Sequence, residues 1–325
     1  MIEIRGLRRS GDPTVLGETP GITEPVHKPS GAGKRMESTM TEGRVLSGIE
    51  FARAGDDGSR PLLLDLYLPG PEGGAAPRPA VVHFHGGGWR MGERSSLGPV
   101  LDGFGNSAFQ TFTDTGFVVA SADYRLSQEA HFPAQLHDAK AAVRWLRNHA
   151  ADYNVDPERI YAWGDSAGGH LASLVGLTTN ADGVNAGDAV AAVAAWYPPT
   201  DLGRMAEQSL PGAVARANDP GSREELLVGA VLADEPAKAS AASPISYASR
   251  SAPPFFLAHG TADRFVPPAQ STSLAAALEA AGTDVELLLI EDADHMWVLP
   301  DHSPAAAEKA MDATVGFFLR QAHVP

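Results

Sequence analysis

The sequence has no cysteine among its 325 residues. Disulfide bonds, thiolate metal ligands and a cysteine nucleophile are therefore excluded. No apolar run approaches the roughly 18 residues that a membrane-spanning helix requires. The first residues include Arg5, Arg8 and Arg9, but no apolar segment of the kind found in secretory signals follows them. We therefore expect no membrane span, no secretory signal and a cytoplasmic location.

Basic residues are outnumbered by acidic ones. The chain has 25 Lys and Arg against 40 Asp and Glu, which gives a formal net charge of -15 and an isoelectric point near 5.1. Such a chain is a poor partner for nucleic acids and anionic membrane surfaces, because like charges repel. The 11 histidines show no spacing with carboxylates that is typical of metal ligands. We expect no nucleic-acid partner, no metal and no cofactor.

Length and composition indicate a globular protein. The length suffices for one large α/β domain or two small ones, and 43% hydrophobic with 20% charged residues is typical of globular chains. Residues 1–44 instead lack hydrophobic periodicity and are rich in Gly, Pro, Ser and Thr. They are predicted to form a flexible or surface-hugging arm. We assign residues 45–325 to a single folded domain.

Short β-prone runs alternate with helix-prone segments through this domain. The runs 45–52 and 62–68 flank a Gly- and Asp-rich turn and are predicted to pair antiparallel. The run 80–85 is apolar on both faces, as strands buried in a parallel sheet are. Further strands are expected at 117–122, 160–163, 190–197, 254–259 and 285–290, and helices at 107–112, 133–152, 167–178, 268–281 and 305–321. The alternation predicts a mostly parallel central sheet with helices on both faces.

Residues 202–243 interrupt this alternation. They are mixed in character, with several prolines and a helix-prone run near 223–232. Loops at the carboxyl end of parallel strands carry function in such folds. We therefore predict a small cap insertion here, and an insertion away from the site is the alternative.

The segment Gly164-Asp165-Ser166-Ala167-Gly168 fits the pattern Gly-x-Ser-x-Gly. Because a β-prone run precedes it and a helix-prone run follows, Ser166 is predicted on a sharp strand-to-helix turn that exposes its hydroxyl. Glycines there remove Cβ atoms where strand and helix backbones pass closely. The N–H of Ala167, in the first helical turn, points to where an oxyanion would develop. Asp165 and His170 are expected to pack or hydrogen-bond locally.

A second glycine motif, His85-Gly86-Gly87-Gly88, follows the strand at 80–85. In lipases and esterases a loop of this kind presents backbone N–H groups beside the nucleophile. Only glycine lets a backbone approach a substrate oxygen so closely. We predict the N–H groups of Gly86 and Gly87 as oxyanion donors beside that of Ala167, with Gly88 as an alternative to one of them.

Acyl transfer by serine also needs a base and an acid that orients the base. Asp263, just after the strand at 254–259, is the predicted acid. Asp201 is its rival, although a turn or N-cap role suits that residue better. The chain therefore supplies an acid on a loop at the same sheet end as Ser166.

The predicted base is His295, on the loop after the strand at 285–290. His302 follows later in the chain, and His259 ends a strand, where a structural role is expected. The chain order of serine, aspartate and histidine is that of the α/β-hydrolases. Trp89, Met296 and Trp297 adjoin these loops and are predicted to wall the substrate pocket, with core packing as the alternative.

Several segments together resemble one family. They include the glycine loop with its flanks, the turn around Ser166 and the loop around Asp263, and they are residues 83–89, 122–126, 132–135, 142–145, 164–172 and 259–267. The chain resembles α/β-hydrolase esterases of the hormone-sensitive lipase type, especially the bacterial feruloyl-esterase-like and acetyl-esterase-like group. The resemblance covers roughly residues 45–322.

The resemblance implies a serine carboxylic ester hydrolase that acts on small or medium esters without a cofactor. It implies Ser166, Asp263 and His295 as the triad, residues 85–87 as the oxyanion loop, and an acyl-enzyme intermediate. Two alternatives stay open at this point. One is an amide-cleaving arylformamidase such as kynurenine formamidase, and the other is a non-catalytic binding protein of the same fold.

Overall fold

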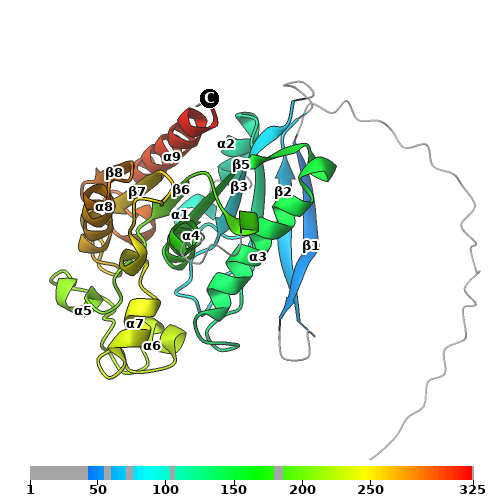
Figure 1. The fold of residues 1–325 in the computed structure, drawn as a ribbon. Helices are drawn as coiled ribbons and strands as arrows, with labels where there is room; N and C mark the ends of the chain where they lie inside the picture. The colour runs from blue at the N-terminus through cyan, green and yellow to red at the C-terminus, as the bar shows by residue number, and fades with distance from the viewer. Residues whose placement is uncertain (1–42, 55–59, 71–75, 103–106, 179–185, 324–325) are drawn as a thin grey trace, which may run out of the picture. The chain divides into compact units, whose positions relative to one another are not determined.

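The computed structural model describes residues 43–54, 60–70, 76–102, 107–178 and 186–323. Within these ranges the chain forms an eight-stranded sheet with the order β1-β2-β4-β3-β5-β6-β7-β8 (Figure 1). The predicted arm lies outside the described residues apart from positions 43 and 44. Among the helices of the described ranges, none is both long and apolar enough to cross a membrane.

Two antiparallel pairings lie at one edge of the sheet. Strand β1 (Arg44–Ala54) pairs with β2 (Arg60–Leu68), and β2 pairs antiparallel with β4. All pairings from β4 to β8 are parallel, and these strands are β3 (Arg78–Phe84), β4 (Val118–Ala122), β5 (Val155–Asp165), β6 (Val193–Trp196), β7 (Phe255–Gly260) and β8 (Val285–Ile290). The antiparallel pair and the mostly parallel sheet are confirmed. β6 ends earlier than predicted, because Tyr197 takes a positive φ of 37° and leaves the strand.

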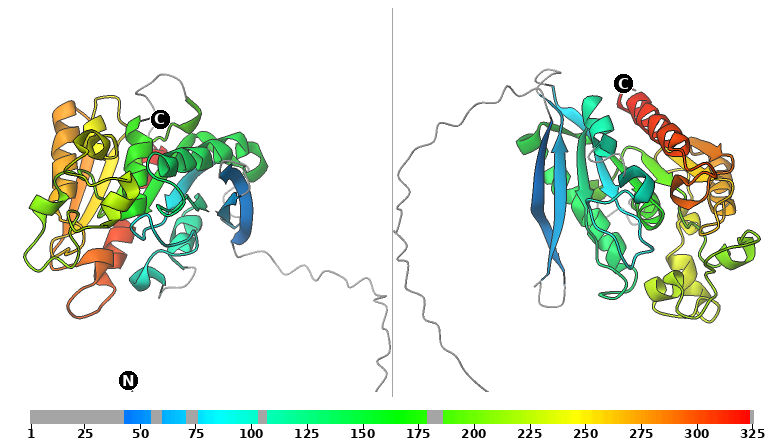
Figure 2. Two further views of the ribbon diagram at one scale, coloured as in Figure 1. Left: turned by 90° about the horizontal axis from the view of Figure 1, so that it is seen from below. Right: turned by 180° about the vertical axis from the view of Figure 1, so that it is seen from behind.

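Helices cover both faces of the sheet (Figure 2, left). One face carries α3 (Ala134–Asn148), α4 (Ala167–Thr178) and α8 (Ala269–Ala281), and the other carries α1 (Pro99–Asp102), α2 (Ser107–Asp114) and α9 (Ala305–His323). The helix predicted at 133–152 is divided. After α3, the 3-10 helix η1 (Ala150–Tyr153) follows, and Asn154, with a left-handed φ of 54°, ends it.

Strand β3 shows why the core has two halves. Successive side chains of a strand point to opposite faces. Ala80, Val82 and Phe84 belong to the cluster under α3 and α4, whereas Val81 belongs to the cluster under α2 and α9. All four are fully buried. Apolar residues on both faces of the strand are therefore explained by helices on both sides of the sheet.

The predicted insertion at 202–243 forms short helices at one end of the sheet (Figures 1 and 2). They are α5 (Met205–Gln208), α6 (Arg223–Val228) and α7 (Pro236–Ala241), and the 3-10 helix η3 (Pro244–Tyr247) leads back to the sheet. The ends of α6 follow from its sequence. Ser222 accepts a hydrogen bond from the Glu225 N–H at the start, and Gly229, with φ 72°, ends the helix.

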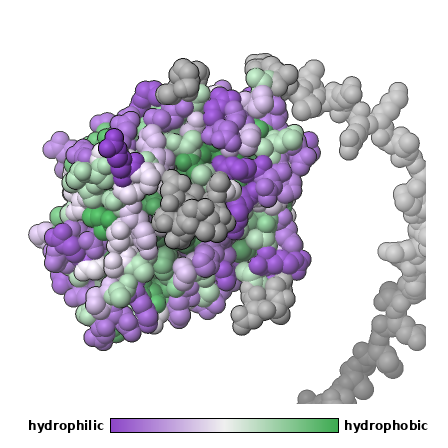
Figure 3. Space-filling model, in the orientation of Figure 1, coloured by the Kyte–Doolittle hydropathy of each residue, from purple (hydrophilic) through white to green (hydrophobic). Residues whose placement is uncertain are grey.

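Polar residues line most of the margin of the face seen in Figure 3, and apolar residues appear there as separate patches. Few large apolar side chains are exposed in the described ranges, and they are scattered along the chain: Val45, Met91, Val214, Leu226, Val231, Leu287 and Leu289. Scattered exposed apolar residues are ordinary on globular proteins.

Candidate active site

Ser166 occupies a strained turn between β5 and α4. Its φ is 51°, a left-handed value that non-glycine residues seldom adopt. The turn requires glycine on both sides: a Cβ at Gly164 would lie 2.3 Å from the Gly168 carbonyl oxygen, and a Cβ at Gly168 would lie 1.9 Å from that of Phe84. A hydrogen bond of 2.8 Å from the Ser166 N–H to the Trp196 carbonyl ties the turn to β6.

The structure brings Ser166, His295 and Asp263 together, although they are far apart in the sequence. His295 begins the short helix η4 (His295–Trp297), which follows β8, and Asp263 follows β7. His295 Nε2 lies 3.0 Å from Ser166 Oγ, and His295 Nδ1 lies 2.6 Å from Asp263 Oδ2. A carboxylate only accepts hydrogen bonds, so Nδ1 carries the proton and Nε2 is left to accept from the serine hydroxyl.

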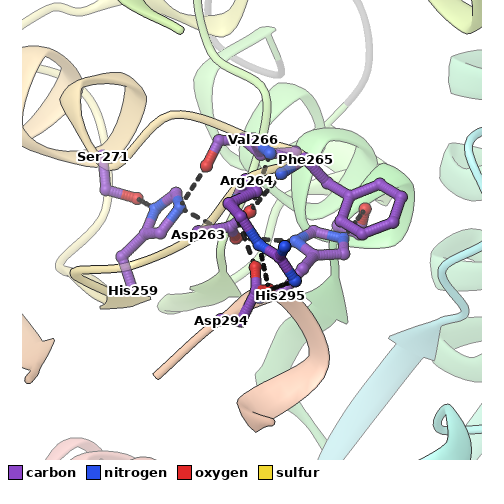
Figure 4. A network of polar contacts seen from close by, with 9 residues as sticks. His259, Asp263, Arg264, Phe265, Val266, Ser271, Asp294 and His295 are labelled. Atoms are coloured by element: carbon purple, nitrogen blue, oxygen red, sulfur yellow. Dashed lines mark hydrogen bonds and ion pairs between the residues drawn. The ribbon is translucent and has the colours of Figure 1, made fainter. Parts of the chain in front are cut away.

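Asp263 is buried among donors (Figure 4). Its Oδ1 accepts 2.8 Å hydrogen bonds from the N–H groups of Phe265 and Val266, and His259 Nε2 lies 3.3 Å from Oδ2. Burial alone would raise the pKa of Asp263, but His295 and then His259 outweigh it and hold that pKa below its usual value. The carboxylate therefore stays ionised beside His295.

His259 and Asp294 support this arrangement from outside (Figure 4). The buried His259 ring also bonds the Ser271 hydroxyl at 2.7 Å and the Val266 carbonyl at 3.0 Å. Asp294 accepts a 2.8 Å hydrogen bond from the His295 N–H, and Arg264 Nε bonds the same carboxylate at 2.7 Å. His259 thus has the structural surroundings expected of it, and it also contacts the acid.

The glycine loop after β3 is held by His85 and Tyr124. His85 Nδ1 donates to the Gly86 carbonyl at 2.7 Å, and the Tyr124 hydroxyl donates to the His85 carbonyl at 2.9 Å. The two rings stack with centroids 4.3 Å apart. Burial lowers the pKa of His85, which keeps the imidazole neutral. A peptide's C=O and the next N–H point in opposite directions, so fixing the Gly86 carbonyl also fixes the Gly87 N–H.

Gly86 lies against the Asp165 carboxylate, since a Cβ at this position would lie 2.2 Å from Asp165 Oδ2. Its backbone N–H lowers the pKa of Asp165. The Gly87 carbonyl accepts 3.2 Å hydrogen bonds from the N–H groups of Arg90 and Met91. The N–H groups of Gly87, Gly88 and Ala167 donate no hydrogen bond to any residue in the part of the chain that the structure describes.

A cavity of about 290 Å³ opens at Ser166. His85, Gly86, Gly87, Gly88, Asp165 and His295 line its inner part, and Arg90, Met91, Arg223, Phe265 and Met296 are among the residues that complete it. A larger cavity of about 780 Å³ lies among the cap helices and contains no member of the Ser166–His295–Asp263 chain. Asp201 lines that other cavity, and His302 is exposed on a loop, so neither rival residue reaches Ser166.

The two tryptophans predicted to wall the pocket do not line this cavity, whereas Met296 does. Trp89 is 1% exposed, and its indole N–H bonds His170 Nδ1 at 3.2 Å. Trp297 is fully buried and packs against Trp196 and Tyr197. The pocket role predicted for Trp89 and Trp297 therefore has to be corrected. Both residues have positive φ, a backbone conformation that the local sequence does not reveal.

Sequence reasoning missed Arg223 and Phe265 as cavity residues. Phe265 follows Asp263 closely, which was a usable signal, and its ring lies 5.4 Å from that of His295. Arg223 comes from the cap, and nothing in the local sequence relates it to Ser166. Within the described ranges, no group of three or more His, Asp or Glu side chains could hold a metal ion.

Comparison with known proteins agrees with this geometry. The family model BD-FAE matches residues 64–278. Esterase LipQ of Mycobacterium tuberculosis is 33% identical over 234 residues, 69% of this chain and 51% of LipQ. Carboxylesterase NlhH of the same species is 30% identical over 247 residues, 74% of this chain and 72% of NlhH. The chain thus spans about half the length of LipQ.

Solved structures show the same architecture. A truncated form of a carbohydrate esterase from gut microbiota superposes with a TM-score of 0.74 at 26% identity, over 88% of this chain and 99% of that one. Esterase 2 of the planctomycete Thermogutta terrifontis gives 0.66 at 27% identity, over 88% and 95%. The predicted α/β-hydrolase fold is therefore confirmed. With the family model matched from β2 to α8, and so across Ser166 and Asp263, this chain belongs to the BD-FAE family.

Proposed function

We propose that this chain hydrolyses carboxylic esters, with Ser166 as the nucleophile. The observation that carries the proposal is the hydrogen-bonded chain from Ser166 through His295 to Asp263, at 3.0 and 2.6 Å, beside a glycine loop. The family and the esterase names of its relatives support the same reaction. The substrates are small-molecule esters that fit a cavity of about 290 Å³.

The reaction follows from the hydrogen bonds. His295 Nε2 takes the proton of the Ser166 hydroxyl as its oxygen attacks the ester carbonyl. Asp263 fixes the imidazole in the tautomer that can accept this proton, and it stabilises the resulting imidazolium. His295 then protonates the leaving alcohol. Water, deprotonated in turn by His295, releases the acid from the acyl-enzyme on Ser166.

We assign the oxyanion donors to Gly87, Gly88 and Ala167. This differs from the predicted set of Gly86, Gly87 and Ala167, because the Gly86 N–H interacts with the Asp165 carboxyl, whose pKa it lowers. The carbonyls of Gly86 and Gly87 accept hydrogen bonds from His85 and from the N–H groups of residues 90 and 91, which fix the two peptides. The following N–H groups are therefore oriented before substrate arrives, which is what makes such donors effective.

The cap insertion at 202–243 forms one wall of the substrate cavity. Its contribution is Arg223, at the start of α6, whose side chain lines the cavity together with Phe265. We assign the reaction to a single catalytic domain at 45–325, to whose site the insertion contributes Arg223.

Ester turnover by Ser166→Ala tests the proposal. The variant should lose hydrolysis of p-nitrophenyl acetate and labelling by a fluorophosphonate probe while keeping the thermal unfolding midpoint of the parent. Ser95→Ala, which removes an exposed hydroxyl bonded to Glu93, is the matched control and should keep both activities. Turnover by Ser166→Ala at the parental rate would refute the proposal. Faster hydrolysis of N-formylkynurenine than of any ester would instead favour the arylformamidase.

A further inference from the structure

Two arginines, Arg223 and Arg90, line the cavity that contains Ser166. The chain carries a formal net charge of -15, so two neighbouring cations at the reactive serine stand out against the rest of the molecule. Ester hydrolysis at Ser166 makes no use of either charge. The positions of these two arginines therefore suggest that they bind a group other than the ester bond.

Arg223 is fixed close to the reacting groups. Its aliphatic stem packs on the glycine loop, since a Cβ at Gly88 would lie 2.6 Å from Arg223 Cδ. Its guanidinium lies 5.7 Å from the centroid of the Phe265 ring. That ring lies 5.4 Å from the ring of His295. A cation over an aromatic face is held electrostatically, so Phe265 positions the charge one ring away from the imidazole.

The guanidinium of Arg223 lacks a good protein partner. Its side chain is 16% exposed, and its one ion pair among the described residues joins Nε to Glu224 Oε1 at 4.0 Å. Among the described residues, none accepts a hydrogen bond from this guanidinium. A largely buried guanidinium is costly unless a partner satisfies it. Its terminal N–H groups therefore remain available to a ligand in the cavity.

Arg90 adds a second charge to the same region. Burial raises the pKa of Glu224, and both Arg223 and Arg90 lower it, so the two guanidinium groups lie near this one carboxyl. Arg90 is exposed, and its side chain has no ion pair within the described ranges. Because two arginines lie near the single buried carboxyl of Glu224, this wall of the cavity carries a net positive charge.

We propose that Arg223, assisted by Arg90, binds an ionised carboxylate carried by the substrate itself. The favoured substrates are then esters with a second, anionic carboxylate on the acyl or the alcohol side. A planar guanidinium fork matches a carboxylate in two parallel hydrogen bonds, and the small cavity favours this compact anion. This inference rests on the proposed ester hydrolysis at Ser166.

Matched ester pairs test the proposal on each side of the bond. On the acyl side, ethyl hydrogen glutarate is compared with its neutral isostere ethyl 5-methylhexanoate. On the alcohol side, 4-acetoxybutanoate is compared with 4-methylpentyl acetate. The parent should prefer the anionic member of at least one pair in kcat/KM. Arg223→Gln should reduce that preference by at least about tenfold, as expected for losing a charge-assisted hydrogen bond, and mostly through KM.

Arg204→Gln is the control, because it removes an exposed cap arginine that pairs with Glu207 and does not line the cavity. It should keep the parental preference. Arg90→Gln changes only an exposed side chain and should reduce the preference as well, so the test does not depend on how well Arg223→Gln folds. An unchanged preference in both Arg223→Gln and Arg90→Gln, or a parent that prefers both neutral esters, would overturn the inference.

A binding measurement separates this inference from the proposed reaction. Ethyl hydrogen glutarate and 4-acetoxybutanoate are each titrated calorimetrically into Ser166→Ala and into the double variant Ser166→Ala/Arg223→Gln. The anion site is supported if Ser166→Ala binds either ester and the double variant binds the same ester at least about tenfold more weakly. Equal binding of both esters by the two variants contradicts it. Full turnover by Ser166→Ala would refute the reaction assignment, whereas equal binding by two inactive variants would refute the anion site alone.

Discussion

Asp165, the residue immediately before Ser166, places its Oδ1 atom 3.5 Å from His83 Nε2 in the protein core. The Ser121 hydroxyl donates to the Arg94 carbonyl at 2.6 Å, so it must accept from His83 Nδ1, 2.9 Å away. Neutral His83 then turns an unprotonated Nε2 toward a carboxylate oxygen, and neither atom has another partner within the described ranges. A proton on Asp165 resolves this conflict.

The pKa values place that proton on the carboxyl. Burial raises the pKa of Asp165 to about 7, although His85, His295 and the Gly86 N–H oppose the rise. Burial lowers the pKa of His83 to about 3, so the ring stays neutral. An aspartate whose pKa is higher in the folded than in the unfolded protein stabilises the fold fully below its unfolded pKa. This stabilisation is lost as the pH rises through about 7.

Asp165→Asn should therefore change how stability depends on pH. The amide donates to His83 at every pH, as the protonated acid does, and its oxygen still accepts from Gly86. Relative to the parent, the variant should gain on the order of 2–3 kcal/mol in unfolding free energy between pH 5 and pH 8, because one pKa unit corresponds to about 1.4 kcal/mol. Urea unfolding at the two pH values measures the gain. Parallel stability curves would show that Asp165 is ionised throughout.

Asp263→Asn should abolish most of the activity while leaving the fold intact. The amide keeps the shape of the side chain, but it removes the charge that stabilises the His295 imidazolium and permits the wrong tautomer. We expect kcat to fall by about 10³–10⁴, with a small change in KM. Steady-state kinetics with p-nitrophenyl acetate measure both constants. Asp201→Asn is the matched control, and a comparable loss in that variant would argue against Asp263 as the acid.

Much of the fold could be predicted because its signals are local. The strands apolar on both faces, such as β3, indicated a sheet covered on both sides, and the strained turn at Ser166 has its own glycine pattern. The order of the motifs, rather than any single one, predicted that Asp263 and His295 would meet Ser166. The structure brings these three side chains within hydrogen-bonding distance.

The remaining features depend on contacts between distant segments. His85 and Tyr124 hold the peptides of the glycine loop by hydrogen bonds from side chains, and the motif alone does not fix those peptide orientations. Arg223 reaches the site only because the cap folds back over the sheet end. Neither relationship has a signature in the neighbouring sequence, so the oxyanion donors that we propose differ from the predicted set at Gly86, and Arg223 was not found from the sequence.

The turn at Ser166 should not tolerate a side chain at Gly168. A Cβ there would lie 1.9 Å from the Phe84 carbonyl oxygen, where the first turn of α4 passes the end of β3. Gly168→Ala should therefore destabilise the protein by about 1–3 kcal/mol or more. Gly187→Ala is the control, since a Cβ there would meet only Arg144 side-chain atoms at 3.6 Å. Thermal unfolding measures both, and equal midpoints for the two variants would contradict the close approach.

His85→Ala should slow catalysis by loosening the glycine loop. Without the imidazole, the Gly86 carbonyl loses its 2.7 Å donor, and the Gly87 N–H on the other side of that peptide is no longer fixed toward the cavity. Losing a whole oxyanion donor costs about 2.7–4 kcal/mol in the barrier, so a donor that is only misaligned should lower kcat by about 10–100-fold. Tyr124→Phe removes only the hydroxyl that bonds the His85 carbonyl and should lower kcat less. Stopped-flow acylation rates with p-nitrophenyl acetate measure both variants. If His85→Ala acylates as fast as the parent, the Gly87 N–H does not depend on this hydrogen bond, and the oxyanion assignment loses its main support.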